Sequence, residues 1–326
     1  MEKVRLKGGS LSGTYLMKPA GAPPFVRKEV SVVQNREYGF QRWYSQLKRM
    51  QRYSVLFPGL FPELIRYGIN EDLAYFDMVF VPDAVTAHDF LIKCEAAQAV
   101  DRLFTQLLAD MGRMHGTRVP SSAEPHVLYV REEVEQKLAD AKASPRFREF
   151  LTHDTLVFNG EEVPSFVKQL DQYKALFKKS YQSCDETFTH GNITLENILY
   201  QPAQNRLVFI DPYEENVIDS VFAEYSQLYQ SCDGYYELYN ERLPVVEGNK
   251  VTLELAKNVG LDRFDDLLTA HIERHHSAAD MVVVRLLEVS QFIRMLPFKM
   301  VIDEGKMILF YALASKLFHN LKAIAA

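Results

Sequence analysis

Residues 188–200 read FTHGNITLENILY, and residues 207–212 read LVFIDP. The apolar runs at 198–200 and 207–210 flank a polar turn, so this stretch predicts a β-hairpin. A hairpin brings the loop before its first strand beside the end of its second strand. We therefore expect Asn192, Asn197 and Asp211 to converge on one site.

These three side chains are of the kinds that phosphoryl transfer uses. An Asn and an Asp can hold Mg²⁺ against the phosphates, while a polar group orients the acceptor hydroxyl. Mg²⁺ prefers hard oxygen ligands and shares its shell with water and phosphate, so one carboxylate and one amide oxygen are sufficient. We predict Asn192, Asn197 and Asp211 as catalytic residues, with Asn197 and Asp211 as the metal ligands.

The rest of the chain separates strands from helices. Strand patterns occupy residues 4–7, 14–18, 25–33, 64–67 and 73–81, with a helical period at 35–53. From about residue 87 the pattern is helical, notably at 94–116, 130–142, 165–180 and most of 220–326. This segregation predicts an α+β fold with a β-rich lobe at residues 1–82 and a larger helical lobe at residues 83–326.

The motif spacing resembles the aminoglycoside phosphotransferase and choline kinase superfamily, whose signature is HGDxxxxNIL followed by an aspartate at a strand end. Here HGN at 190–192 is followed, after four residues, by NIL at 197–199 and then by IDP at 210–212. The resemblance implies a bilobal protein-kinase-like fold. It also implies an ATP-dependent O-phosphotransferase, a small-molecule kinase, that uses ATP and Mg²⁺.

The resemblance further implies a nucleotide site in the first lobe. Lys28, on the third strand, matches the lysine that contacts the α- and β-phosphates, and Glu37 matches its ion-pair partner. The residues that match the phosphate-covering loop are Gly8, Gly9, Ser10, Ser12 and Gly13. Those that match the adenine-binding hinge are Met78, Val79 and Val81.

Some of these assignments have competitors. Lys18 could replace Lys28, and Arg27 points to the opposite side of its strand from Lys28, so only one of that pair can face the cleft. The glycine turn alone could merely join two strands. Glu37 could be a solvated residue in the first turn of a helix, where a negative charge is favourable.

Asn192 departs from the family, which has an aspartate there to accept the proton of the substrate hydroxyl. An amide can hydrogen-bond but cannot act as a carboxylate base. Three interpretations stay open: an engineered Asp-to-Asn variant made to trap a bound substrate, a natural nucleotide-binding pseudokinase that regulates or binds a partner, and a natural enzyme with a different proton acceptor. A protein kinase is disfavoured because HRD, DFG and APE segments are missing.

Two further clusters have both an ordinary and a functional interpretation. His271 and His275 are four residues apart and could hold a metal, but no third ligand is near in sequence, which favours a solvated helix face. A dense set of tyrosines could pack in the core or form a wall for a sugar or cationic substrate. Its members are Tyr225, Tyr229, Tyr235, Tyr236 and Tyr239.

Composition limits the partners. The net charge of −6 argues against a general nucleic-acid binder. No segment reaches the roughly 18 uncharged apolar residues of a membrane span, and the N-terminus has no apolar signal region. With three cysteines far apart in the chain, a cytoplasmic protein is expected. The predicted partner is a small hydroxylated acceptor (a sugar, aminoglycoside or amino alcohol), while the nucleotide preference and oligomeric state stay open.

Overall fold

The computed structural model describes residues 2–6, 12–34, 39–119, 125–181, 186–213 and 216–325. Contacts within the chain divide it into two units. The first unit contains Met1–Phe90, Thr105–Met114 and His190–Asn216, and the second contains Leu91–Phe104, His115–Thr189 and Val217–Ala326. The lobe boundary between residues 82 and 83 stays a prediction.

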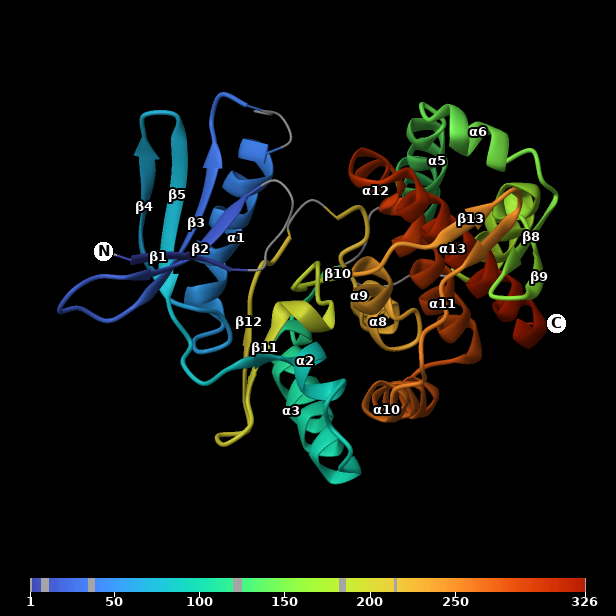
Figure 1. Ribbon diagram of the computed structural model, residues 1–326. Coiled ribbons are helices and arrows are strands. Elements are labelled where there is room, and N and C mark those ends of the chain that lie inside the picture. The colour runs from blue at the N-terminus through green and yellow to red at the C-terminus, as the bar shows by residue number, and fades with distance from the viewer. Residues whose placement is uncertain are drawn as a thin grey trace. The chain divides into compact units, whose positions relative to one another are not determined.

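An antiparallel sheet of five strands, in the order β1-β2-β3-β5-β4, forms much of the first unit (Figure 1). Its register places Lys28 between Thr14 of β2 and Phe76 of β5. The predicted strands are therefore present, with shifted ends. Their bounds are β1 Glu2–Arg5, β2 Gly13–Lys18, β3 Phe25–Ser31, β4 Leu64–Asn70 and β5 Leu73–Val79.

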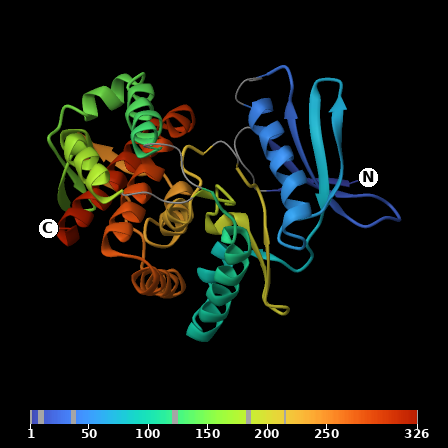
Figure 2. The ribbon, with the colours of Figure 1, turned by 180° about the vertical axis from the view of Figure 1, so that it is seen from behind.

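Helix α1 (Gln41–Leu56) packs on this sheet (Figure 2). Its apolar side chains recur at helical spacing, and Trp43, Leu47 and Met50 are all buried. The Trp43 ring lies 5.8 Å from the Phe76 ring of β5, centroid to centroid. This buried stripe fixes α1 against the sheet and directs its other faces outward.

The predicted hairpin is confirmed. Strands β11 (Ile198–Gln201) and β12 (Arg206–Phe209) pair antiparallel, and the short β6 (Val85–Thr86) adds to β11. Asn205 adopts a left-handed φ of 49° at the turn, and its Oδ1 accepts a 2.9 Å hydrogen bond from the Tyr200 hydroxyl. A side-chain hydrogen bond thus closes the turn, in addition to the backbone hydrogen bonds between β11 and β12.

The second unit is mainly helical, as predicted. Helix α11 packs against α8 and α13 around fully buried side chains such as Leu287 and Phe310. Within the described ranges, no helix is both long and apolar enough to cross a membrane. The other helices of the described residues are α2 Ala87–Leu91, α3 Ala97–His115, α4 Pro125–Tyr129, the π-helical Val130–Glu135, α5 Gln136–Ala141, α6 Pro145–Phe150, α7 Leu170–Ser180, α8 Val221–Cys232, α9 Tyr236–Asn240, α10 Val259–His275, α11 Ala278–Arg294, α12 Leu296–Ile302 and α13 Glu304–Ala325, with 3₁₀ turns at Phe166–Gln169 and Leu195–Asn197.

The second unit also contains a sheet that the sequence analysis missed, with strand order β13-β14-β8-β9. The turn between β8 and β9 is Asn159-Gly160, with φ values of 48° and 85°, a pairing typical of tight hairpins. Residues 220–326 were predicted to be mostly helical, and β13 and β14 interrupt that helical region. The bounds are β8 Thr155–Phe158, β9 Glu161–Pro164, β13 Val245–Glu247 and β14 Lys250–Thr252, and a separate pair joins β7 Arg118–Val119 to β10 Glu186–Thr187.

Candidate active site

Asp211 follows β12 in the first unit and has a left-handed φ of 57°. Its Oδ2 lies 2.8 Å from the Nζ of Lys28, a residue only 6% exposed. Burial would raise the pKa of Asp211, but the neighbouring positive groups, chiefly the Lys28 ammonium, together outweigh it, and the net effect is a lowered pKa. The carboxylate is therefore ionised at neutral pH and protonates only as the pH falls below its usual range.

Lys28 is the cation of β3 that reaches Asp211. Its neighbour Arg27 lies on the opposite face of the strand and donates two hydrogen bonds to Asp77, at 2.7 and 2.8 Å. Lys18 pairs with Glu2 at 3.4 Å on the surface. Because side chains alternate along β3, Lys28 and Arg27 face opposite sides of the strand and pair with different carboxylates.

The nitrogen of the Asn197 side-chain amide is held by two hydrogen bonds. Its Nδ2 donates to the backbone oxygen of Asn192 at 2.8 Å and to the Thr194 hydroxyl at 3.2 Å. Its backbone oxygen accepts a hydrogen bond from the amide of Ile210, the residue before Asp211. The described residues give its Oδ1 no hydrogen-bond donor, so this oxygen remains available as a ligand.

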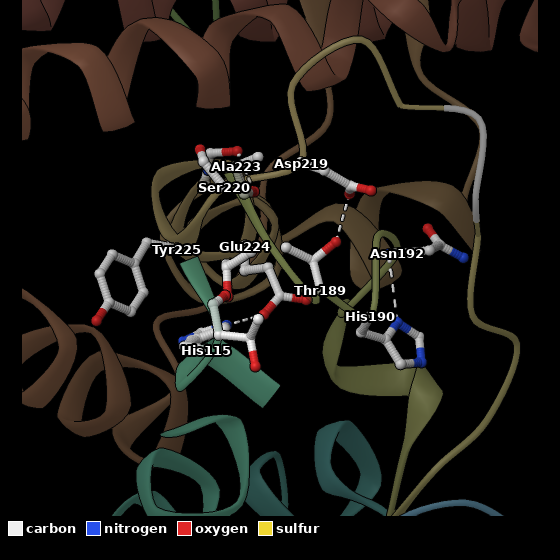
Figure 3. Close-up of polar contacts among 12 residues, drawn as sticks. His115, Thr189, His190, Asn192, Asp219, Ser220, Ala223, Glu224 and Tyr225 are labelled. Carbon is white, nitrogen blue, oxygen red and sulfur yellow. Dashed lines mark hydrogen bonds and ion pairs between the residues drawn. The ribbon is translucent and has the colours of Figure 1, made fainter. Parts of the chain in front are cut away.

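His190 holds the loop that contains Asn192 (Figure 3). Its Nε2 lies 2.8 Å from the backbone oxygen of Ile210, and its Nδ1 lies 3.2 Å from the backbone amide of Asn192. Because a carbonyl only accepts and an amide N–H only donates, the fitting neutral tautomer carries its proton on Nε2. The ring stacks on Phe61 and meets Phe209 edge-on. His190 is therefore a structural support for this loop.

Gly191 allows this loop to turn. It has a φ of 79°, and a Cβ there would lie 2.1 Å from the backbone oxygen of Tyr213. The same Cβ would lie 2.6 Å from Nη1 of the buried Arg49, which also approaches the His190 carbonyl. A backbone oxygen cannot move aside cheaply, so only glycine fits.

We expect Gly191→Ala to destabilise the protein by about 2–3 kcal/mol, since it combines a left-handed φ with a clash. Thermal denaturation should show this as a lowered midpoint. Gly21→Ala is the matched control, because Gly21 has a similar φ of 74° and nothing within 4 Å of its Cβ position. Equal midpoints for the two variants would contradict the packing argument.

Asn192 is half-buried, and its backbone is held from both sides by His190 and Asn197. No hydrogen bond to its side-chain amide is found in the described part of the chain. The side chain can therefore turn toward a bound acceptor. It can orient a hydroxyl by hydrogen bonding but cannot take its proton.

The predicted nucleotide residues are only partly described. Gly8, Gly9, Ser10 and Glu37 lie outside the described residues. Ser12 precedes β2, and Gly13 pairs with Glu29 one position from the Thr14–Lys28 pair, which brings the end of this loop to the strand of Lys28.

The predicted hinge lies at the end of β5. Met78 is buried and Val81 half-buried, while Val79 is exposed and its amide donates to the backbone oxygen of Glu63. Gln201 of β11 donates to the backbone oxygen of Pro82 at 2.7 Å. This bond ties the segment after β5 to the hairpin that precedes Asp211.

The second unit contains polar pairs that the sequence analysis did not predict (Figure 3). The Thr189 hydroxyl donates to Asp219, whose backbone oxygen also accepts from the Thr187 amide. His115, at the end of α3, lies 2.5 Å from the fully buried Glu224. The sequence context of Glu224 gave no sign of burial, because polar Gln227 and Ser231 follow it at helical spacing along α8.

The histidines of α10 are not arranged as a metal site. His271 meets the Tyr225 hydroxyl at 3.1 Å, and His275 bonds to the backbone oxygen of His271. Burial, with neighbouring positive groups, lowers the pKa of His271 to about 4. The described residues include no group of three or more side chains suited to a metal.

The tyrosines of this region are mostly core residues. Tyr225, Tyr229, Tyr236 and Tyr239 are all buried. Tyr235 has a φ of 47°, and its hydroxyl donates to Asp262 at 2.5 Å. Core packing accounts for the set better than a substrate wall does.

Arg42 and Arg49 of α1 were missed as site residues. Arg49 approaches the His190 carbonyl, and the Arg42 guanidinium lies over the Tyr213 ring. Neither arginine stood out in the sequence, because α1 carries four basic residues within its first twelve positions.

Comparisons with known proteins bear on the fold. No protein-family model matches the chain, and no curated protein matches its sequence. The structure is similar to that of the protein named "Putative fructosamine-3-kinase" from Haemophilus somnus 129PT, with a TM-score of 0.58, over 98% of this chain and 92% of that one. At 9% identity this likeness shows the fold alone. The Mycobacterium tuberculosis PknI kinase domain matches over 96% of this chain and 93% of its own at 13% identity, but its TM-score of 0.39 is too low to support an argument.

The fold is therefore α+β and protein-kinase-like, as the sequence predicted.

Proposed function

We propose that this protein is an ATP- and Mg²⁺-dependent O-phosphotransferase for a small hydroxylated molecule. The observation that carries the proposal is the Lys28–Asp211 ion pair, together with Asn197, whose backbone oxygen accepts a hydrogen bond from Ile210, the residue before Asp211. A kinase-like fold supports a phosphotransferase in general terms. The fold alone does not specify the acceptor.

The residues present fit a magnesium ion. Asp211 is ionised, and the amide nitrogen of Asn197 is engaged, which leaves its oxygen to serve as a ligand. When bound, the ion would neutralise charge on the phosphates. Lys28 would contact the inner phosphates, and the end of the glycine loop at Ser12 and Gly13 would cover them. Met78, Val79 and Val81 would bind the adenine.

Asn192 would orient the acceptor hydroxyl toward the terminal phosphate. The acceptor itself is proposed as a sugar, an aminoglycoside or an amino alcohol. The structurally similar protein named as a fructosamine-3-kinase makes a sugar derivative a reasonable first choice for testing. The free thiols of Cys94 and Cys232 are in keeping with a reducing, cytoplasmic location.

A second candidate is a nucleotide-binding pseudokinase that acts as a regulator or partner-binding module. Asn192 is the observation that favours it, because position 192 lacks the carboxylate base that the superfamily uses. Both candidates require nucleotide binding, and they differ in turnover.

Calorimetry with ATP tests the shared requirement. We expect ATP to bind in the presence of Mg²⁺ and to bind about tenfold or more weakly in excess EDTA, because the ion shields phosphate charge beside Asp211. AMP, which has no β- or γ-phosphate, is the matched control and should show no such Mg²⁺ dependence. Identical ATP affinities with and without Mg²⁺ would contradict the proposed metal site.

A further inference from the structure

Strand β4 (Leu64–Asn70) forms one edge of the five-stranded sheet, and no described strand of the first unit pairs with its outer side (Figures 1 and 2). Three of its side chains are apolar and exposed. Ile65, Tyr67 and Ile69 are 52%, 55% and 62% exposed, and their alternate spacing puts them on one face of the strand. An edge strand of this kind is suited to pairing with another strand, because it offers both unpaired backbone groups and apolar surface.

The register of β4 on β5 shows which face carries these side chains. Tyr67 lies opposite Phe76, and Ile69 lies opposite Ala74. Phe76 and Ala74 are buried, and the Phe76 ring lies against Trp43 of α1. Tyr67 and Ile69 therefore stand on the face of the sheet that α1 covers elsewhere, and they continue its apolar surface beyond the part that α1 buries.

The opposite edge of the same sheet has a different character. Strand β1 carries three charged side chains in four positions, Glu2, Lys3 and Arg5, and charges on an edge strand oppose pairing with another chain. Strand β4 has neither lysine nor proline, and its one charged side chain, Arg66, is paired at 2.7 Å with the buried Asp77. Charge therefore disfavours pairing at the β1 edge and does not do so at the β4 edge.

The sequence of β4 is self-complementary in an antiparallel pair. When Tyr67 lies opposite Tyr67 of a second copy, Ile65 lies opposite Ile69, and Arg66 lies opposite Gly68, which has no side chain to crowd it. Apolar side chains then meet apolar side chains across the pair. A shift of one position would instead place Arg66 opposite Ile69. The register of β4 on β5 is regular apart from one shift at its start, so most of the strand can pair in this way.

We infer that β4 is a dimerisation strand, which pairs antiparallel with β4 of a second copy of this chain about a two-fold axis at Tyr67. The two five-stranded sheets then form one continuous sheet, with the exposed apolar side chains of both copies side by side. The partner is a second copy because the register that matches apolar with apolar residues is itself two-fold symmetric. A single strand pair is a small interface, so we expect a dissociation constant on the order of micromolar. This inference is independent of the nucleotide site.

Sedimentation equilibrium of the full chain over a range of concentrations tests the dimer. Ile69→Lys should weaken association by about tenfold or more, because it places a charge opposite Ile65 of the other copy. Val301→Lys is the matched control, since Val301 is 83% exposed on α12 of the second unit and undergoes the same kind of change. It should alter the dissociation constant by less than about twofold. Both positions are exposed, and circular dichroism should show that both variants keep the fold.

Cysteine cross-linking tests the register. Tyr67→Cys places a thiol opposite its own copy, where directly opposed Cα atoms lie about 4.5–5.5 Å apart, within the range of a disulfide. Ile69→Cys is the matched control, because four positions separate Ile69 from its own copy along the pair, a distance of about 13 Å. Under a mild oxidant, Tyr67→Cys should form a disulfide-linked dimer, whereas Ile69→Cys and the unaltered chain should not.

An unaltered chain that stays monomeric up to about 300 µM would overturn the inference, because the expected association is then far too weak. A dimer that Val301→Lys disrupts and Ile69→Lys does not would also overturn it, since the contact would then lie on another surface. A dimer in which Ile69→Cys cross-links as readily as Tyr67→Cys would contradict the two-fold register.

Discussion

Replacing Asn192 with aspartate should raise ATP-dependent phosphorylation of a suitable hydroxyl by about 10²–10⁴-fold, the usual range for a general base. Asparagine and aspartate have the same shape, and the backbone at position 192 is fixed by His190 and Asn197. The new carboxylate should therefore occupy the position of the present amide. It differs from the amide in its negative charge and in its ability to accept a proton.

The measurement is an acceptor screen with the Asn192→Asp protein and ATP, read by the mass of the product. Asn205→Asp is the matched control, because it adds the same charge at the far end of the hairpin, where either side chain can accept from Tyr200. No gain in turnover for any acceptor, with ATP binding intact, would support the pseudokinase. High turnover in the unaltered protein would point to a different proton acceptor.

Replacing Asp211 with asparagine should weaken Mg·ATP binding by about 100-fold or more, because it removes the only carboxylate of the proposed metal site. It also leaves the buried Lys28 ammonium without its anionic partner. An uncompensated buried charge of this kind costs about 3–5 kcal/mol of folding stability. Calorimetry and thermal denaturation should therefore both register the change.

A second variant separates the two effects. Asp211→Asn combined with Lys28→Met removes both charges of the pair and should recover much of the lost stability, since an apolar side chain suits the buried position. Metal-dependent binding should stay absent in this double variant. If the stable double variant still binds Mg·ATP with wild-type affinity, Asp211 is not a metal ligand.

The elements that could be predicted from the sequence are those whose residue pattern lies within one short segment of the chain. The hairpin after Asn197 was predictable because two apolar runs flank a polar turn, and α1 because its buried side chains repeat at helical spacing. The missed sheet had a local signal as well, since Asn159-Gly160 is a typical hairpin turn. Its strands, however, have only three or four residues each, and β8 pairs with β14 about 90 positions further along the chain. No local sequence pattern predicts a pairing between segments so far apart.

The candidate site was predictable in its residue types but not in its contacts. The salt bridge between Lys28 and Asp211 joins residues far apart in sequence, whereas the sequence suggested Glu37 as the partner of Lys28. The left-handed backbone of Asp211 could not be foreseen, since aspartate adopts it only where surrounding structure requires it. The role of Gly191 depends on the approach of the Tyr213 carbonyl, which is equally non-local.

The Lys28–Asp211 pair has a consequence for how a metal would enter. The Lys28 ammonium is paired with the carboxylate that the metal ion would bind. The folded chain therefore already places a positive charge of its own beside Asp211. Loading the site is then an exchange of one cation for another. Because Asp211 is already ionised, no proton has to leave it when the ion arrives. The heat of metal loading should accordingly be the same in buffers of very different ionisation enthalpy.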